Sequence, residues 1–303
     1  MSENKHSFRA GFISVMGRPN VGKSTLINAL LGQKVAAVSP RPQTTRQQQL
    51  GILTSDDYQL VFVDTPGLHK AHHKLGQYMN QEAAEALEDA DLILFVVDIT
   101  QTPPHEEDHI LVDLLGELDA SPRVILAINK IDRVSKDEIS ERLAKYQSLV
   151  PTALAIPISA SRGDGLDTLL STFEELTPEG TPFYPPDQVT NLYEREIAAD
   201  LIRATALIHL QDEVPHAIAI RIDEYTERGD HGAYIRATMI VERESQKGIV
   251  IGEKGRMIKR IGSHARTQIE NMSGRKVYLQ LRVKVRKNWR NNENALRQFG
   301  FQR

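Results

Sequence analysis

Residues 17–24 read Gly17-Arg18-Pro19-Asn20-Val21-Gly22-Lys23-Ser24. A short apolar run, 11–16, precedes them, and residues 23–31 have the pattern of a helix. This is the phosphate-binding pattern G-x-x-x-x-G-K-[ST] in its strand–loop–helix setting. Glycines let the N–H groups of the loop approach phosphate, and the start of the helix adds the positive end of its dipole. The stretch therefore predicts a nucleotide-binding α/β domain.

Two side chains of this loop have predicted roles. Lys23 is expected to reach the β- and γ-phosphates, and the Ser24 hydroxyl to ligate Mg²⁺. A glycine-rich turn without a ligand is the alternative, and the complete pattern with both flanks argues against it. The residues assigned to phosphate binding are Gly17, Arg18, Pro19, Asn20, Val21, Gly22, Lys23, Ser24 and Thr25.

Length and composition fit two domains. The chain has 303 residues, 40% of them hydrophobic, which is enough for two separate cores. Residues 181–303 hold 21 Lys and Arg against 15 Asp and Glu, and 247–290 hold 13 against 2. This basic segment predicts a polyanionic partner, with a solvated basic face as the alternative.

The chain has no cysteine, which excludes disulfides, thiolate zinc sites and cysteine nucleophiles. We see no apolar signal segment and no apolar run near roughly 18 residues, so a cytoplasmic location is expected.

From residue 8 to 176, short apolar runs alternate with helical patterns, as in an α/β domain with a mostly parallel sheet. The predicted strands are 12–16, 51–53, 59–63, 92–97, 123–128 and 153–156. The predicted helices are 23–31, 75–87, 106–118, 136–148 and 166–175. Ligand-binding loops of such sheets lie at the carboxyl ends of strands, so further site residues are expected there.

The strand 59–63 is followed by Asp64-Thr65-Pro66-Gly67. A carboxylate at a buried strand end beside a phosphate-binding loop can hold Mg²⁺, and the Gly67 N–H can bond a γ-phosphate oxygen. An ordinary turn is the alternative, but the place directly after an apolar strand favours the site. All four residues are assigned to the phosphates.

The strand 123–128 is followed by Asn129-Lys130-Ile131-Asp132. The Asp132 carboxylate can accept hydrogen bonds from the ring N–H and the amine of guanine, a donor pair that adenine lacks. Asn129 can bridge to the phosphate-binding loop, and the stem of Lys130 can cover the base. The N–H groups of Ser159-Ala160-Ser161 could meet the guanine carbonyl.

These motifs, in this order, resemble the translation-factor-type P-loop GTPases over residues 11–175. The resemblance places the first switch loop in 36–50 and gives a threonine there an Mg²⁺ ligand role. Thr44 and Thr45 both fit, and Thr45 is favoured because it directly precedes Arg46. The implied Mg²⁺ ligands are Ser24, Thr45 and Asp64. The implied catalytic residues are Lys23, Thr45, Asp64 and Gly67.

One position departs from Ras-like GTPases. Leu68 stands where they have a water-orienting glutamine, so slow intrinsic hydrolysis is expected. Asn20 stands where related GTPases ligate K⁺, and a turn-stabilising amide is the equal alternative. Arg18, Arg41 and Arg46 are candidate charge donors, and the sequence selects none of them.

Four prolines in residues 176–187 predict an interdomain linker. The expected domains are therefore a GTPase domain at 8–176, a linker at 177–187 and a second domain at 188–303. In the second domain we expect a helix at 191–210, strands at 216–224 and 233–243, two helices around 252–255 and a strand at 276–285. The order is α-β-β-α-α-β.

The G-x-x-G loop between the two helices, Gly252-Glu253-Lys254-Gly255, is typical of the KH module, which clamps about four nucleotides of single-stranded RNA. The predicted RNA contacts are Lys247, Ile251, Gly252, Glu253, Lys254, Gly255, Arg256, Lys259 and Arg260. Glu253 should point away from phosphate. Ile249, Ile251, Ile258 and Ile261 could form an apolar floor for bases, although several are expected in the core, and Trp289 is expected to pack rather than stack on a base.

The whole chain resembles the bacterial Era family: a P-loop GTPase domain followed by an α+β type II KH domain. Motifs 17–24, 43–46, 64–69, 129–132 and 250–255 carry the resemblance. It implies GTP and GDP as ligands and Mg²⁺ as cofactor. It also implies GTP-controlled binding of single-stranded 16S ribosomal RNA near its 3′ end during 30S assembly, in a monomer with peripheral contact with the inner membrane.

Four alternatives stay open. A P-loop ATPase or small-molecule kinase would share residues 17–24, but Asp132 argues for guanine. An RNA adaptor with a vestigial nucleotide site would show no GTP turnover. A GTPase of tRNA modification would need its own chemistry, for which we find no cysteine or folate-like site. The fourth is a membrane-associated or cell-cycle signalling switch with RNA as its regulator.

Overall fold

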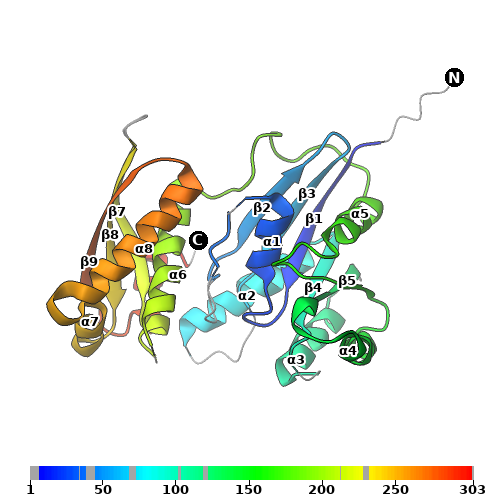
Figure 1. The fold of residues 1–303 in the computed structure, drawn as a ribbon, viewed down its shortest axis with the longest axis horizontal. Coiled ribbons are helices and arrows are strands. Elements are labelled where there is room, and N and C mark those ends of the chain that lie inside the picture. Colours follow the sequence, from blue (N-terminus) through cyan, green and yellow to red (C-terminus); the bar gives the residue numbers. More distant parts are fainter. Residues whose placement is uncertain are drawn as a thin grey trace. The chain divides into compact units, whose positions relative to one another are not determined.

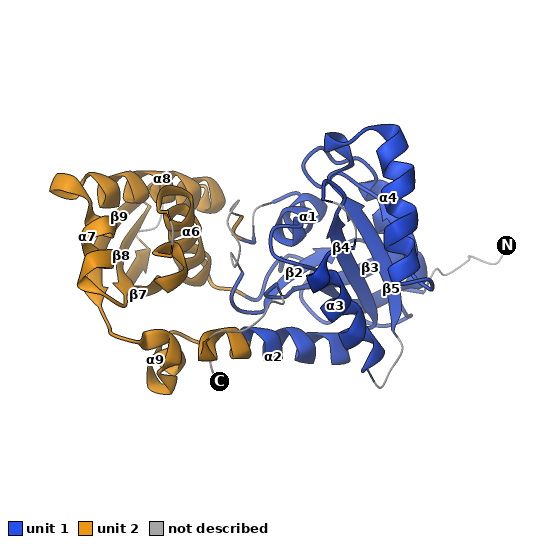
Figure 2. Cartoon of the chain, turned by 90° about the horizontal axis from the view of Figure 1, so that it is seen from below, with its two compact units in different colours: residues 1–36, 45–69, 79–191 blue, residues 37–44, 70–78, 192–303 orange. Residues whose placement is uncertain are grey.

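The computed structural model describes residues 7–33, 35–38, 45–67, 73–101, 104–118, 122–211, 213–227 and 232–301 (Figure 1). The chain forms two compact units (Figure 2). Residues 1–36, 45–69 and 79–191 make the first unit, and residues 37–44, 70–78 and 192–303 make the second. No helix in the described part of the chain has the length and apolar character needed to span a bilayer.

The first unit contains the predicted α/β sheet. Its strands are β1 (Arg9–Met16), β2 (Gln49–Thr54), β3 (Tyr58–Asp64), β4 (Leu92–Asp98), β5 (Arg123–Asn129) and β6 (Leu154–Pro157). They lie in the order β2-β3-β1-β4-β5-β6, with β2 antiparallel to β3 and all other pairs parallel. Its helices are α1 (Lys23–Leu31), α2 (Lys74–Glu88), α3 (Glu106–Gly116), α4 (Lys136–Leu149) and α5 (Leu166–Leu176). The mostly parallel sheet is confirmed.

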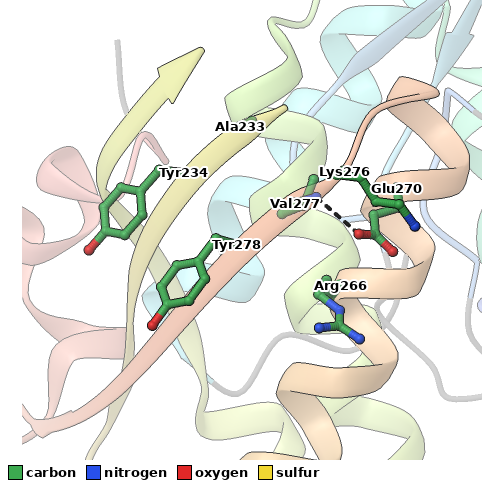
Figure 3. Close-up of a pocket in the computed structure, with 7 residues that line it drawn as sticks. All are labelled: Ala233, Tyr234, Arg266, Glu270, Lys276, Val277 and Tyr278. Carbon is green, nitrogen blue, oxygen red and sulfur yellow. Dashed lines mark hydrogen bonds between the residues drawn. The ribbon is translucent and has the colours of Figure 1, made fainter. Parts of the chain in front are cut away.

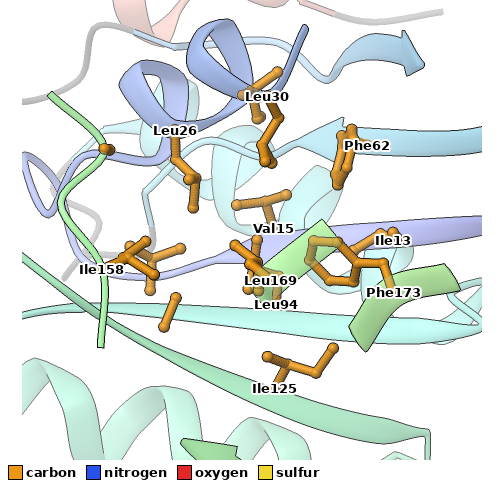
Figure 4. Packing of buried hydrophobic residues seen from close by; sticks show 14 of the residues in the cluster. Ile13, Val15, Leu26, Leu30, Phe62, Leu94, Ile125, Ile158, Leu169 and Phe173 are labelled. Atoms are coloured by element: carbon orange, nitrogen blue, oxygen red, sulfur yellow. The ribbon is translucent and has the colours of Figure 1, made fainter. Parts of the chain in front are cut away.

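Helices cover both faces of this sheet, because alternate residues of each strand point to opposite sides. On one face, α1 and α5 pack on side chains such as Val15, Leu94 and Phe62 (Figure 4). On the other face, residues of α2, α3 and α4 pack on Phe95 and Leu126. The near-continuous apolar runs of β4 and β5 are the consequence of burial on both faces.

Strand register brings the site loops to one edge of the sheet. Val15 near the end of β1 is paired with Asp64 at the end of β3, and Asp98 at the end of β4 is paired with Asn129 at the end of β5. The loops that leave β1, β3, β4 and β5 therefore start side by side, at the edge where parallel sheets bind ligands.

The second unit has the order α-β-β-α-α-β that the sequence predicts. Its elements are α6 (Glu194–His209), β7 (Ala219–Glu227), β8 (Ala233–Val241), α7 (Glu244–Ile251), α8 (Arg256–Ser273), β9 (Val277–Val285) and α9 (Glu293–Gln298). The sheet order is β7-β8-β9, with β8 antiparallel to β7 and parallel to β9. Helices α6 and α8 pack on one face of this sheet.

Trp289 is a core residue of the second unit. It is fully buried, and its indole N–H donates to the carbonyl of Ala217 at 2.9 Å. The rings of Phe299 and Phe301 lie against it. The expected packing role is confirmed, and base stacking is excluded.

The proline-rich segment after α5 forms no helix or strand, but hydrogen bonds attach it to the first unit. The Ala10 N–H donates to Pro178 O at 3.1 Å, the Gln59 amide donates to Tyr184 O at 2.9 Å, and the Ile52 N–H donates to Val189 O at 2.9 Å. Residues 178–189 therefore belong to the first unit, and the unit boundary falls at 191–192.

Replacing Phe173 by Ala should destabilise the first unit by about 3–5 kcal/mol, because its buried ring packs edge-on against Phe62 at 5.5 Å. Urea unfolding followed by circular dichroism measures this loss. Fluorescence of Trp289, the only Trp of the chain, follows unfolding of the second unit. The urea concentration at the midpoint of that transition should stay unchanged.

Phe183, which is 51% exposed, provides the control, because Phe183→Ala should cost about 1 kcal/mol or less. If Phe173→Ala shifts the unfolding midpoints measured by circular dichroism and by Trp289 fluorescence to the same extent, the two units do not have separate cores.

Candidate functional site

The loop 17–24 connects β1 to α1 and depends on two glycines. Gly17 has φ +149°, and a Cβ there would lie 2.4 Å from the carbonyl oxygen of Val96. Gly22 has φ +109°, and its Cβ would lie 2.4 Å from the side-chain nitrogen of Asn129. Only glycine fits at either position, because the neighbouring atoms are held by a strand and by a buried side chain.

Lys23 is buried beneath this loop. Its Nζ donates to Gly17 O at 2.8 Å and to Arg18 O at 3.1 Å. Burial lowers the pKa of Lys23 to about 8, while the negative charge of Asp64 acts in the opposite direction. Phosphate groups in the loop would favour the charged form of Lys23.

Three oxygen ligands from distant segments meet beside Lys23. The Ser24 hydroxyl donates to Asp64 Oδ2 at 2.8 Å, and the Thr45 hydroxyl donates to the same oxygen at 3.1 Å. The two hydroxyl oxygens lie 3.1 Å apart. Hydroxyl and carboxylate oxygens are the hard ligands that Mg²⁺ prefers, so these residues fit the expected metal. Thr44, the other candidate of the switch, lies outside the described residues.

The segment after β3 lies against the phosphate-binding loop. A Cβ on Gly67 would meet Pro19 at 3.0 Å. The Thr65 hydroxyl donates to Val15 O at 2.7 Å, which fixes the turn to the end of β1 and leaves only its backbone for a ligand. Pro66 lies between them, and Leu68 is outside the described residues.

Asn129 connects three loops through one buried side chain. Its Nδ2 donates to Val21 O at 2.8 Å, in the phosphate-binding loop. Its Oδ1 accepts from the N–H of Ala160 at 3.0 Å and from the N–H of Lys130 at 2.8 Å. The predicted bridge from Asn129 to the phosphate-binding loop is therefore present, and it extends to residues 159–161.

Asp132 has the partners needed to keep its carboxylate charged. The Ser159 hydroxyl donates to Asp132 Oδ1 at 2.7 Å and lies 3.3 Å from the hydroxyl of Ser161. This hydrogen bond is the main cause that lowers the pKa of Asp132, and the nearby charges of Arg162 and Arg133 act in the same direction. An ionised carboxylate is what two donors of a guanine edge require.

The G-x-x-G loop joins α7 to α8 through positive φ angles. Gly252 has φ +70°, and a Cβ there would lie 2.6 Å from that of Met257. Gly255 has φ +77°, begins α8, and faces open space. The loop therefore presents main chain at a helix start, as a backbone clamp requires.

The charges around the loop are mostly free for an anion. Lys254, Lys259 and Arg260 are exposed. Arg256 lies 3.5 Å from Glu253, and Lys247 lies 3.5 Å from Glu244.

The predicted apolar floor beside the loop is only partly available. Ile249 is 50% exposed, and Ile251 and Ile258 are half-buried. Ile261 is fully buried in the core and is excluded from the floor.

Comparison with known proteins agrees with this geometry. A family model described as 50S ribosome-binding GTPase matches residues 12–130, and a KH domain model matches 213–290. GTPase Era of Halothermothrix orenii is 47% identical and covers 97% of this chain and 99% of its own length. GTPase Era of Geobacter metallireducens is 45% identical, with 99% and 100% covered. The chain belongs to the Era family of GTPases. It is therefore an enzyme that hydrolyses GTP.

Solved structures of Era have the same fold along the whole chain. One holds MgGDPNP and nucleotides 1506–1542 of 16S ribosomal RNA, and it matches with a TM-score of 0.91 at 38% identity. Another, from Aquifex aeolicus, holds GDP and AlF₄⁻ and matches with the same values. Each match covers 98% of this chain and all of the solved one.

Sequence analysis missed Asp98, a buried residue that contacts Lys130. Its Oδ2 accepts from Nζ of Lys130 at 2.5 Å, and the same Nζ donates to Asn20 O at 2.8 Å. Lys130 is thereby held across the position expected for the base. The signal was available, because Asp98 directly follows an apolar strand, as Asp64 and Asn129 do.

Arg18, one of the three candidate charge donors, is engaged by other side chains in this structure. Its guanidinium is buried and forms an ion pair with buried Asp108 at 2.7 Å and a hydrogen bond with Gln101 at 2.9 Å. Because its guanidinium is paired with Asp108, Arg18 can contribute only its backbone N–H to phosphate binding. Arg46 is buried, and Arg41 lies outside the described residues.

Gly22→Ala should lower GDP affinity at least about tenfold, because the new methyl group displaces Asn129 from its hydrogen bonds. Isothermal titration calorimetry measures the effect. Gly32→Ala is the matched control: Gly32 also has positive φ, at the end of α1, but a Cβ there meets nothing within 4 Å. Unchanged GDP affinity in Gly22→Ala would contradict the role given to Asn129.

Proposed function

We propose that this chain is a GTP-hydrolysing switch that binds single-stranded ribosomal RNA near the 3′ end of 16S RNA and acts in 30S assembly. The gathering of phosphate, metal and base ligands at one edge of the sheet carries the proposal for the nucleotide. The exposed G-x-x-G loop carries it for RNA, supported by the Era complex with 16S nucleotides.

Base choice follows from Asp132. Its ionised carboxylate can accept two hydrogen bonds from guanine, whereas adenine would leave it facing an acceptor. Lys130, held between Asp98 and Asn20, covers one face of the base with its aliphatic stem. The Ala160 N–H already donates to Asn129 Oδ1 at 3.0 Å, so the Ser161 N–H is the donor that we assign to the guanine carbonyl.

The phosphates rest on the N–H groups of residues 17–25, with Lys23 beside the β- and γ-phosphates. Ser24, Thr45 and Asp64 hold Mg²⁺. The bound ion neutralises charge that develops on the β- and γ-oxygens. The Gly67 N–H binds the γ-phosphate and reports its presence.

Hydrolysis relies on positioning and charge neutralisation rather than on a side-chain base. Leu68 cannot orient water, and Arg18 is already paired with Asp108. We therefore expect a low intrinsic rate that K⁺ at Asn20 raises. Asn20 has φ +66° and is exposed.

The switch proposal rests on Thr45 and Gly67. Both contact the γ-phosphate in the GTP state and lose that contact after hydrolysis. Loss of these two contacts after hydrolysis is the event by which we propose that nucleotide state controls RNA binding. The monomeric state, the cytoplasmic location and the peripheral membrane contact remain predictions from the family.

Gly255→Asp should lower affinity for single-stranded RNA at least about tenfold, because it adds a negative charge where phosphates bind. GTP binding should stay unchanged. Gly274→Asp is the matched control: it has the same positive φ and open surroundings at the other end of α8. Fluorescence anisotropy with labelled RNA measures the effect.

Lys23→Ala should lose GTP binding and turnover while keeping the RNA affinity of the nucleotide-free chain, the opposite of the effect expected for Gly255→Asp.

RNA binding that is equal in Gly255→Asp and Gly274→Asp would refute the assignment of the G-x-x-G loop to RNA binding.

A further inference from the structure

The face of the β7-β8-β9 sheet opposite α6 and α8 presents two tyrosines. Tyr234 on β8 is the register partner of Tyr278 on β9. Their rings are stacked, with centroids 5.6 Å apart and planes 12° from parallel. Tyr278 is 67% exposed, and both rings project from the side of the strands opposite α8 (Figure 3). An exposed, preformed stack of this kind offers a flat surface to a base.

A hollow of about 360 Å³ adjoins the stack at the free edge of β9. Besides the two tyrosines, Arg266, Glu270 and Lys276 line it. Glu270 also accepts the N–H of Val277 at 3.0 Å, which occupies the first donor of the edge strand (Figure 3). The hollow therefore holds two cations and one carboxylate that is already engaged, whereas the two tyrosine rings project to the other side of the strands (Figure 3).

Positive charge continues along the same strand. Residues 271–292 contain seven Lys and Arg and no Asp or Glu. Arg282 and Lys284 alternate with inward-facing residues on β9, so they share the face of Tyr278. Among the described residues, Lys276, Arg282 and Lys284 form no ion pair. Acidic residues of β7, on the other side of β8, are paired: Glu224 with Arg236, and Asp223 with Arg221.

We propose that this tyrosine platform, Tyr234 and Tyr278 with Lys276, Arg282 and Lys284, is a second contact surface for single-stranded RNA. The inference rests on the proposed RNA-binding function. Bases stack on Tyr278, and phosphates lie beside the three cations. Charge complementarity selects RNA over an added protein strand, because basic side chains on an edge strand oppose strand pairing.

The two tyrosines of the platform and the G-x-x-G loop lie at opposite ends of α8. Gly255 precedes the first residue of the helix, whereas Tyr278 follows the turn after its last residue. The 18-residue helix separates them by about 27 Å at 1.5 Å per residue. A strand of about four nucleotides fills the loop alone, whereas a strand of about twelve can occupy both surfaces.

The test compares Tyr278→Ala with Tyr278→Phe in the full chain, by anisotropy with labelled RNAs of about four and about twelve nucleotides. Tyr278→Ala should weaken binding of the longer RNA about 5- to 150-fold and leave the shorter one unchanged. Tyr278→Phe keeps the stacking surface and should bind both like the wild type.

If Tyr278→Ala and the wild type bind the longer RNA with equal affinity, the proposed second RNA contact surface is refuted. The basic side chains of β9 would then serve only to prevent pairing of the edge strand with another strand. Loss of both RNAs in Tyr278→Ala also overturns it, because the defect is then structural. Failure of the wild type to bind either RNA refutes the proposed RNA function itself.

Discussion

The side chain of Asn129 is the interaction on which the nucleotide site depends. Its amide nitrogen holds the phosphate-binding loop through Val21, and its oxygen holds the loop of Ala160. Phosphate recognition and base recognition are thus fixed relative to each other by one buried group. The same contact explains the absence of a side chain at Gly22, because a methyl group there would occupy the position of the amide.

This brace works because the sheet is parallel. The loops of the site that follow β1, β3, β4 and β5 begin at the carboxyl ends of these strands, so residues distant in sequence meet at one edge of the sheet. The segment of Thr45, between α1 and β2, reaches the same edge. Ser24, Thr45 and Asp64 come from three segments of the chain. The hydroxyl groups of Ser24 and Thr45 both donate to the same carboxylate oxygen of Asp64. The hydrogen bond from Ser159 keeps the Asp132 carboxylate charged, and phosphate in the loop would restore the positive charge that burial disfavours on Lys23.

The sequence predicted the helices and strands well, because apolar runs and glycine spacing are local signals. Pairings across long sequence distances escaped it: Arg18 with Asp108 and Lys130 with Asp98. Nothing in the local sequence pattern distinguishes an arginine that contacts phosphate from one that pairs with a buried carboxylate. The attachment of residues 178–189 to the first unit depends on backbone hydrogen bonds that composition does not encode. Likewise, the stack of Tyr234 on Tyr278 follows from strand register alone.

The central claim, a pocket in which Asp132 selects guanine, is tested most directly by exchanging the base and the side chain together. Xanthine has a carbonyl where guanine has its amine, and an amide at residue 132 offers a donor to that carbonyl. We predict that the wild type binds GTP at least about 100-fold better than XTP and that Asp132→Asn reverses the preference. An Asp132→Asn protein that still prefers GTP, or a wild type that binds both alike, would contradict the account.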